Sequence, residues 1–174
     1  ALLNGLDELL AQHPDYIPAL LKRYLLAKRF EHPHNTIERL ESLITKAPEN
    51  KDYPVVLGQV LTLEQQVPQA IAQFESVLDD TPQPFWSSLS RNYQKSGQFE
   101  KFVELNRKWL AKQPNNAMAI LGNAVALESR GDTKQALELT SHYVNDMEGT
   151  NLEVRLLHIH LLLKSQQFEL AQTL

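Results

Sequence analysis

Hydrophobic residues recur every three or four positions along the chain, in segments that end at a proline or a glycine. This spacing places the apolar side chains on one face of an α-helix, which has about 3.6 residues per turn. A proline ends such a helix because it lacks a backbone N–H and restricts the residue before it. The pattern therefore predicts an all-α chain, with about eleven helical segments joined by short turns.

The prolines that end these segments are almost evenly spaced. They are Pro14, Pro48, Pro82 and Pro114, and the last interval is slightly shorter than the two before it. In a fifth segment, "SHYVNDMEGTN", the pair Glu148-Gly149 stands in place of the proline, and glycine also ends helices. A recurrence of about 34 residues is typical of repeat proteins, in which each unit buries its apolar face against the next.

A second marker lies between the prolines. The segments "KSGQFEKFVEL" and "SRGDTKQALEL" align Gly97 with Gly131, and each glycine falls between two predicted helices. Glycine adopts the left-handed backbone conformation that closes a helix. In the following helix Ala136 aligns with Ala70 and Ala171, which predicts a close approach of two helices there.

Gly131 is also the centre of Arg130-Gly131-Asp132, a tripeptide that animal cell-surface receptors bind in adhesion proteins. Receptor binding requires an exposed, extended loop tip, whereas this tripeptide spans a predicted helix end and a short turn. We therefore interpret it as a joint between two helices.

The resulting unit of helix, tight turn, helix and second turn resembles the tetratricopeptide repeat (TPR). The best match is 117–150, where the family's packing positions are occupied by Leu121, Ala124, Gly131, Ala136 and Tyr143. The resemblance covers essentially the whole chain. It implies an α-solenoid, a right-handed superhelix of antiparallel helix pairs with about 34 residues per repeat.

On this basis residues 1–174 are predicted to form a single TPR-like solenoid. Residues 1–16 would be the second helix of a truncated repeat and 151–174 a truncated final repeat. The complete repeats between them are 17–50, 51–82, 83–116 and 117–150. The shorter interval between Pro82 and Pro114 predicts a local change in superhelical twist across 78–86.

Three large aromatic residues modify the predicted repeat packing locally. Phe102 stands where the family prefers alanine, so its helix pair is expected to be spaced more widely or tilted. Trp86 and Trp109 fall on apolar repeat positions, which predicts core packing for both indoles. An aromatic cage for a ligand is the alternative.

Composition narrows the classes of partner. The formal net charge is −4, from 17 basic and 21 acidic residues, which argues against the polybasic surface typical of nucleic-acid binding and leaves room only for a local basic patch. No apolar run approaches the roughly 18 residues needed to cross a bilayer, so direct membrane insertion is not expected. Absence of cysteine excludes disulfides and fits both the cytoplasm and the bacterial periplasm. Both ends interrupt a helical pattern, so we expect a fragment of a longer bacterial repeat array.

No catalytic, cofactor-binding or metal site is predicted. His158 and His160 lie two positions apart on a predicted helix, so they point in different directions and cannot share one ion. His32 and His34 flank a proline in a predicted turn, without carboxylate or thiolate neighbours. The chain contains no nucleophile elbow and no glycine-rich phosphate loop.

The TPR resemblance implies a partner-binding surface, because in this family the first helix of each pair lines the concave face. The residues that it implies are Leu21, Leu25, Lys28, Arg29, Val55, Gln59, Thr62, Ser87, Arg91, Gln94, Lys95, Leu121, Val125, Glu128, Leu156, His160 and Lys164. Basic residues outnumber the single acidic one, which favours an acidic or carboxylate-ended partner segment. The alternative is that these side chains only solvate an exposed helix face.

We therefore predict a non-catalytic protein–protein interaction scaffold that binds a partner segment in its concave groove. One alternative is a self-assembling structural segment, because apolar side chains are predicted to be uncovered at both ends of the chain. These are Leu2, Leu6, Leu9 and Leu10 at one end and Phe168 and Ala171 at the other. Another alternative, by analogy of fold, is a periplasmic assembly or export factor of a bacterial envelope system for polysaccharide or secretion.

Overall fold

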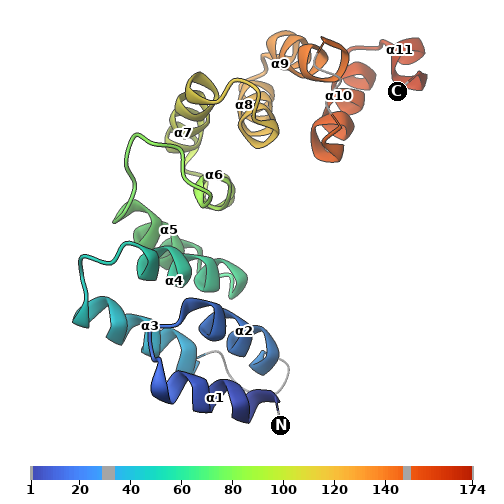
Figure 1. Cartoon of the computed structure of the whole chain (residues 1–174). Helices are drawn as coiled ribbons and strands as arrows, with labels where there is room; N and C mark the ends of the chain where they lie inside the picture. The colour runs from blue at the N-terminus through green and yellow to red at the C-terminus, as the bar shows by residue number, and fades with distance from the viewer. Residues whose placement is uncertain (1, 29–33, 147–149, 174) are drawn as a thin grey trace. The chain divides into compact units, whose positions relative to one another are not determined.

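The computed structural model describes residues 2–28, 34–146 and 150–173. These residues form helices joined by turns, without any strand among them (Figure 1), which confirms the all-α prediction. Arg29, His32 and Glu148-Gly149 lie outside the described residues. The chain divides into two compact units, Ala1–Leu78 and Asp79–Leu174.

The first unit contains five helices. Their bounds are α1 Leu2–Gln12, α2 Ile17–Ala27, α3 His34–Lys46, α4 Asp52–Leu63 and α5 Val67–Glu75. Helix α4 packs against α2, α3 and α5, and α1 packs against α2. Leu10 of α1 is completely buried, so the prediction that it is uncovered is wrong: its side chain belongs to the core of this unit. Leu2 is 63% exposed, as predicted.

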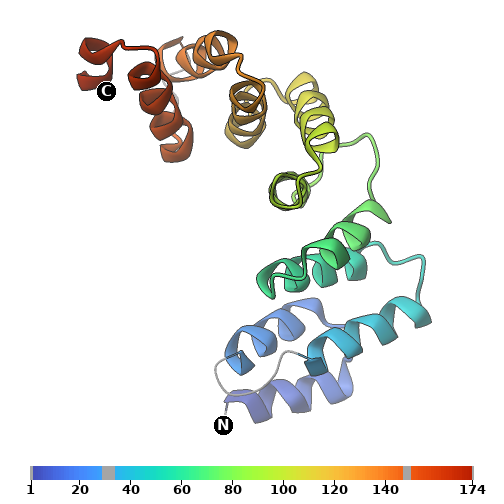
Figure 2. The same ribbon diagram turned by 180° about the vertical axis from the view of Figure 1, so that it is seen from behind.

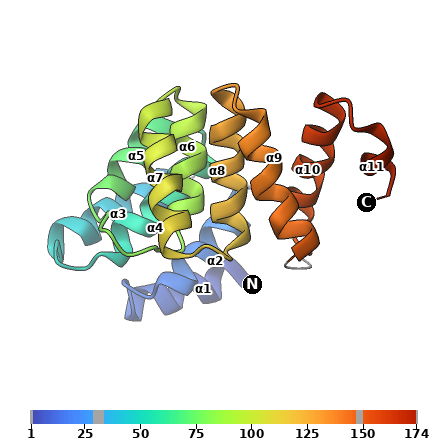
Figure 3. The same cartoon turned by 90° about the horizontal axis from the view of Figure 1, so that it is seen from above.

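The second unit also consists of helices joined by short turns. Its elements are α6 Trp86–Lys95, α7 Phe99–Lys112, α8 Ala117–Ser129, α9 Thr133–Ser141, a π-helical turn at His142–Asp146, α10 Leu152–Lys164 and α11 Phe168–Gln172. Each helix contacts the next one along the chain, and α8 also contacts α6 and α10. Figure 2 shows these pairs from behind, and Figure 3 shows α8, α9 and α10 side by side. We call α2, α4, α6, α8 and α10 the first helices.

The boundary between the units falls at Leu78–Asp79, at the start of the segment for which the sequence predicts a change in twist. That change and the single-solenoid organisation stay predictions. At the carboxyl-terminal end Phe168 is 56% exposed, as predicted, while Ala171 is partly buried.

The first helices from α4 onward all end in the same turn. Gln65, Gly97, Gly131 and Gln166 have φ angles of 61°, 73°, 82° and 61°, in the left-handed region. The N–H of the residue after each one donates to a carbonyl five residues earlier, at 2.9 to 3.0 Å. This bond is the mark of a Schellman motif, which satisfies carbonyls left free at a helix end.

The left-handed conformation was predicted at the two glycines and was not predicted at the two glutamines, although a turn was expected in each repeat. The tripeptide at 130–132 is one of these joints, because Asp132 caps α9 by accepting a hydrogen bond from the backbone N–H of Gln135 at 3.3 Å. The interpretation of this tripeptide as a turn is therefore confirmed.

Candidate partner-binding site

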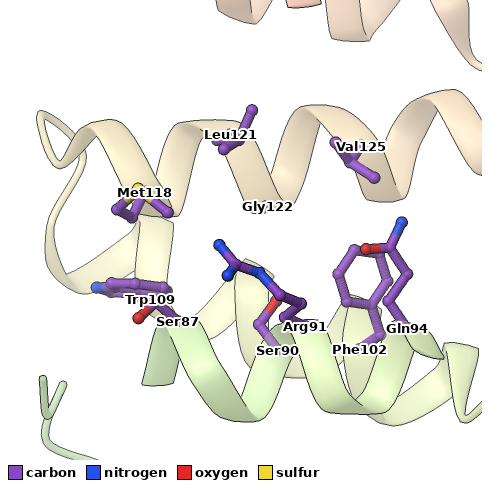
Figure 4. A pocket seen from close by; sticks show the side chains of 10 residues that line it. All are labelled: Ser87, Ser90, Arg91, Gln94, Phe102, Trp109, Met118, Leu121, Gly122 and Val125. Atoms are coloured by element: carbon purple, nitrogen blue, oxygen red, sulfur yellow. The ribbon is translucent and has the colours of Figure 1, made fainter. Parts of the chain in front are cut away.

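A pocket of about 120 Å³ opens between α6 and α8, with α7 behind it (Figure 4). We call it the α6–α8 pocket. Its lining residues are Ser87, Ser90, Arg91 and Gln94 of α6, Phe102 and Trp109 of α7, and Met118, Leu121, Gly122 and Val125 of α8. Five of them belong to the surface that the TPR resemblance implied: Ser87, Arg91, Gln94, Leu121 and Val125.

The back of the pocket is formed by buried aromatic side chains. Phe102 is 2% exposed and Trp109 is 5% exposed. The ring of Trp109 packs edge to face against Trp86, with centroids 6.2 Å apart and planes at 79°. The indole N–H of Trp109 donates to Oε1 of Gln113 at 2.9 Å. The core-packing prediction is confirmed for both tryptophans, and the wider helix spacing expected from Phe102 stays a prediction.

A buried polar contact fixes the three helices around the pocket. Asn106 of α7 is completely buried, and its Nδ2 donates to Ser90 Oγ and to the Phe102 carbonyl oxygen, each at 2.7 Å. A Cβ atom built on Gly122 would lie 1.9 Å from Oδ1 of Asn106. Only a glycine therefore lets α8 approach this amide, and the contact was not predicted from the sequence.

The charge of the pocket comes from a single side chain. Arg91 is the one charged residue among the ten that line it, and it is exposed. Within the described part of the chain neither Arg91 nor Lys95 forms an ion pair. Lys95 lies in the last turn of α6 and does not line the pocket. Arg91 extends from α6 towards α8, as does Gln94 (Figure 4).

Solved structures with a similar fold are TPR proteins. A tetratricopeptide repeat protein from Parabacteroides merdae superimposes with a TM-score of 0.73 at 12% identity, over 98% of this chain and 68% of its own. The TPR-like fold is thereby established. MamA from Desulfovibrio magneticus RS-1 gives 0.71 at 14% identity, over 91% and 90% of the two chains. Another MamA structure gives 0.67 at 18% identity, over 84% and 86%. By sequence alone, no family model and no curated protein matches.

None of the other described residues of the predicted set lines the α6–α8 pocket. Two lysines are paired across consecutive first helices: Lys164 Nζ lies 2.5 Å from Glu128 Oε1, which links α10 to α8. Lys28 Nζ lies 3.0 Å from Oε1 of Glu64, just beyond α4. Because these charges are compensated, the lysine and arginine side chains of the predicted set that form no ion pair among the described residues are Arg91 and Lys95 of α6.

Glu64 is a partner of Lys28 that was not predicted from the sequence. The hydroxyl group of Tyr24 donates to the carboxylate that pairs with Lys28. Burial, followed by this hydrogen bond and the charge of Glu64, raises the pKa of Tyr24 well above its ordinary value. Gln59 is partly exposed on α4 and forms no hydrogen bond to Tyr24, Lys28 or Glu64.

The two histidines of α10 differ in their surroundings. His158 is buried, and its Nδ1 lies 2.9 Å from Oγ1 of Thr140 on α9, whereas His160 is exposed. Burial, and then the charge of Arg155, lower the pKa of His158. Among the described residues no group of three histidine or acidic side chains is arranged to hold a metal ion. In the same residues no helix has the length and apolar character needed to cross a membrane.

Proposed function

We propose that this chain is a non-catalytic protein–protein interaction scaffold, which binds a segment of a partner protein across α6 and α8. One observation carries the proposal. Residues that the TPR resemblance assigns to ligand contact, among them Arg91, Gln94 and Val125, come together around one pocket. They come from two helices that are separate in the sequence, so the packing of the repeat assembles the surface.

The size of the pocket supports a peptide segment over a cofactor. Sites for small molecules usually enclose about 300 to 1,000 Å³. The α6–α8 pocket has about 120 Å³, which is too small to enclose a ligand of that class. A partner segment instead covers a surface and inserts a side chain where the surface is hollow.

The charge of α6 supports an acidic partner. Arg91 and Lys95 are both exposed on this helix and carry uncompensated positive charge in the described structure. A carboxylate that approaches a guanidinium or an ammonium group gains a charge-assisted hydrogen bond, which is stronger than a neutral one. The two cations would also steer an acidic segment towards α6.

The test is a selection of random peptides, displayed on phage, against the immobilised chain. The enriched peptides should bind the native chain and lose affinity for the double variant Arg91→Glu/Lys95→Glu, with helicity unchanged by circular dichroism. Lys112→Glu is the control, because Lys112 is also exposed but lies on α7. Failure to enrich any peptide, or equal affinity for the double variant, would remove the proposal.

Self-association is a second candidate, because large apolar side chains are exposed near the carboxyl-terminal end. Leu152, Leu156 and Phe168 are 68%, 56% and 56% exposed. If copies of the chain cover these side chains, the average mass in sedimentation equilibrium rises with concentration, and Leu156→Lys reduces the rise. A constant monomer mass up to about 1 mM would argue against self-association. The role in a bacterial envelope stays a prediction.

A further inference from the structure

The two walls of the α6–α8 pocket differ in chemistry. The α6 wall carries Ser87, Arg91 and Gln94, which follow one another at helical spacing and end in polar groups. The α8 wall carries the apolar side chains of Met118 and Val125. A ligand that complements both walls therefore has an apolar group facing α8 and a polar, acidic group facing α6 (Figure 4).

The volume limits the apolar part to one side chain of moderate size. A cavity of about 150 Å³ lined by aliphatic and aromatic residues holds one benzene molecule. The 120 Å³ of the present pocket therefore suits a leucine, isoleucine, valine or methionine side chain, and is small for an indole. Burial of such a side chain against Phe102 and Val125 removes apolar surface from water, which favours binding.

The single positive charge of the pocket lining limits the ligand to one carboxylate. Arg91 supplies the single positive charge of the lining. A second carboxylate in the same space would be partly desolvated without a counter-charge, which is unfavourable. A side-chain carboxylate within a continuous segment meets this limit, whereas a carboxyl-terminal acidic residue brings two negative groups, its side chain and its α-carboxylate.

We propose that the α6–α8 pocket recognises an internal segment in which one aliphatic residue is followed or preceded by an aspartate or glutamate. The aliphatic side chain occupies the pocket against α8, and the carboxylate pairs with the guanidinium group of Arg91 on α6. Gln94 and Ser87, on either side of Arg91 along the helix, hydrogen-bond the backbone of the segment. This inference rests on the proposed scaffold function and specifies the chemistry of its ligand.

The experiment repeats the phage selection with three forms of the chain: native, Arg91→Gln and Val125→Phe. Sequencing of peptides enriched on the native chain should show an aliphatic residue next to an acidic one. Arg91→Gln should remove the preference for the acid, and Val125→Phe, which fills the pocket, should remove the preference for the aliphatic residue. Lys95→Gln should leave both preferences unchanged, because Lys95 is exposed outside the pocket.

Affinities of synthetic peptides then test each contact. In an enriched sequence with blocked ends, replacing the acid by its amide should weaken binding roughly tenfold, and replacing the aliphatic residue by alanine roughly tenfold or more. The same peptide with a free carboxyl terminus directly after the acid should bind no better. Thermal unfolding tests whether Val125→Phe is folded, and Met118→Phe serves as a second pocket-filling variant if it is not.

The outcomes separate this inference from the proposed function. Enriched peptides whose affinity falls with Arg91→Glu/Lys95→Glu but not with either pocket-filling variant would leave the scaffold in place and overturn the pocket assignment. A basic or aromatic consensus, or a requirement for a free carboxyl terminus, would also overturn it. Absence of any enriched peptide would overturn both.

Discussion

Two contacts between consecutive first helices of the second unit can be compared directly. Between α8 and α10, the paired charges of Glu128 and Lys164 link the helix ends, and Ala124 and Leu161 lie in one buried cluster. Between α6 and α8, Arg91 has no acidic partner in the described structure and a pocket remains. Two contacts between first helices thus differ: α8 and α10 pack closely where the charges match, and a pocket remains between α6 and α8, where the charge of Arg91 has no acidic partner among the described residues.

The largest effect on the free energy of unfolding is expected at Gly122, where α8 approaches the buried amide of Asn106 on α7. In Gly122→Ala the new methyl group would lie 1.9 Å from Oδ1 of Asn106, so α8 must shift or the buried amide must lose its hydrogen bonds. We expect a loss of about 2 to 4 kcal/mol in the free energy of unfolding, measured by urea denaturation. The double variant Gly122→Ala/Asn106→Ala should recover part of it.

Gly5→Ala provides the matched control for this substitution. Gly5 lies inside α1, and a Cβ atom there would have no neighbour within 4 Å. Replacing a glycine in a helix by alanine stabilises by about 0.5 to 1 kcal/mol when there is space. Equal effects of the two substitutions would contradict the tight contact between α7 and α8.

The next largest effect is expected at the turns that follow the first helices. Gly97 closes α6 with φ 73°, and Gln166 closes α10 with φ 61°. A left-handed backbone costs a residue with a Cβ atom roughly 1 to 2 kcal/mol relative to glycine. Gly97→Ala should therefore destabilise the chain by about 1 kcal/mol, and Gln166→Gly should stabilise it by up to about 1 kcal/mol. Thermal unfolding of the two variants measures the direction of each change in stability. A change in the same direction for both would contradict the assignment of these residues to left-handed turns.

A pH-dependent effect on the free energy of unfolding is expected from His158 of α10, which contacts Thr140 of α9. Burial lowers the pKa of His158 below its ordinary value of 6.5, so the unfolded chain binds the proton more readily. The stabilisation is complete above about pH 7.5 and is lost as the pH falls through about 6.5 towards the lower value in the folded chain. His158→Gln should flatten the pH dependence of the free energy of unfolding below about pH 7.5, as measured by urea denaturation at a series of pH values.

The smallest effect is expected at the ion pair that closes the α8–α10 joint. Both side chains are partly exposed, so Lys164→Gln should reduce the free energy of unfolding by only about 0.2 to 1 kcal/mol. The loss should shrink in about 1 M NaCl, since salt screens exposed charges. A loss of several kcal/mol, insensitive to salt, would show that the joint is held by something other than this pair.

The sequence predicted features that depend on one position at a time. Gly97 and Gly131 were placed at turns because few other residues adopt a positive φ. Arg91 and Gln94 were placed on one face of a helix by repeat register, and both line the α6–α8 pocket. Gln166, like Gln65, adopts the same turn without any signal in its residue type. The backbone conformation of these two turns is therefore determined by the helices on either side and not by the residue type.

Features that depend on two distant positions were missed or misplaced. Glu128 and Lys164 are 36 residues apart, and their ion pair was not predicted because it requires the geometry of α8 against α10. The contact between Asn106 and Gly122 likewise exists only once α7 and α8 are packed. Leu10 was taken as uncovered because the pattern of one helix does not show what covers it.

The approach of α8 to a buried amide also constrains how this protein can evolve. A larger residue at 122 meets the side chain at 106, so the two positions form an epistatic pair. Shortening Asn106 first opens a path to substitution at Gly122, and the reverse order passes through an unstable intermediate. In a lineage of such chains, small residues at 106 should therefore precede larger ones at 122.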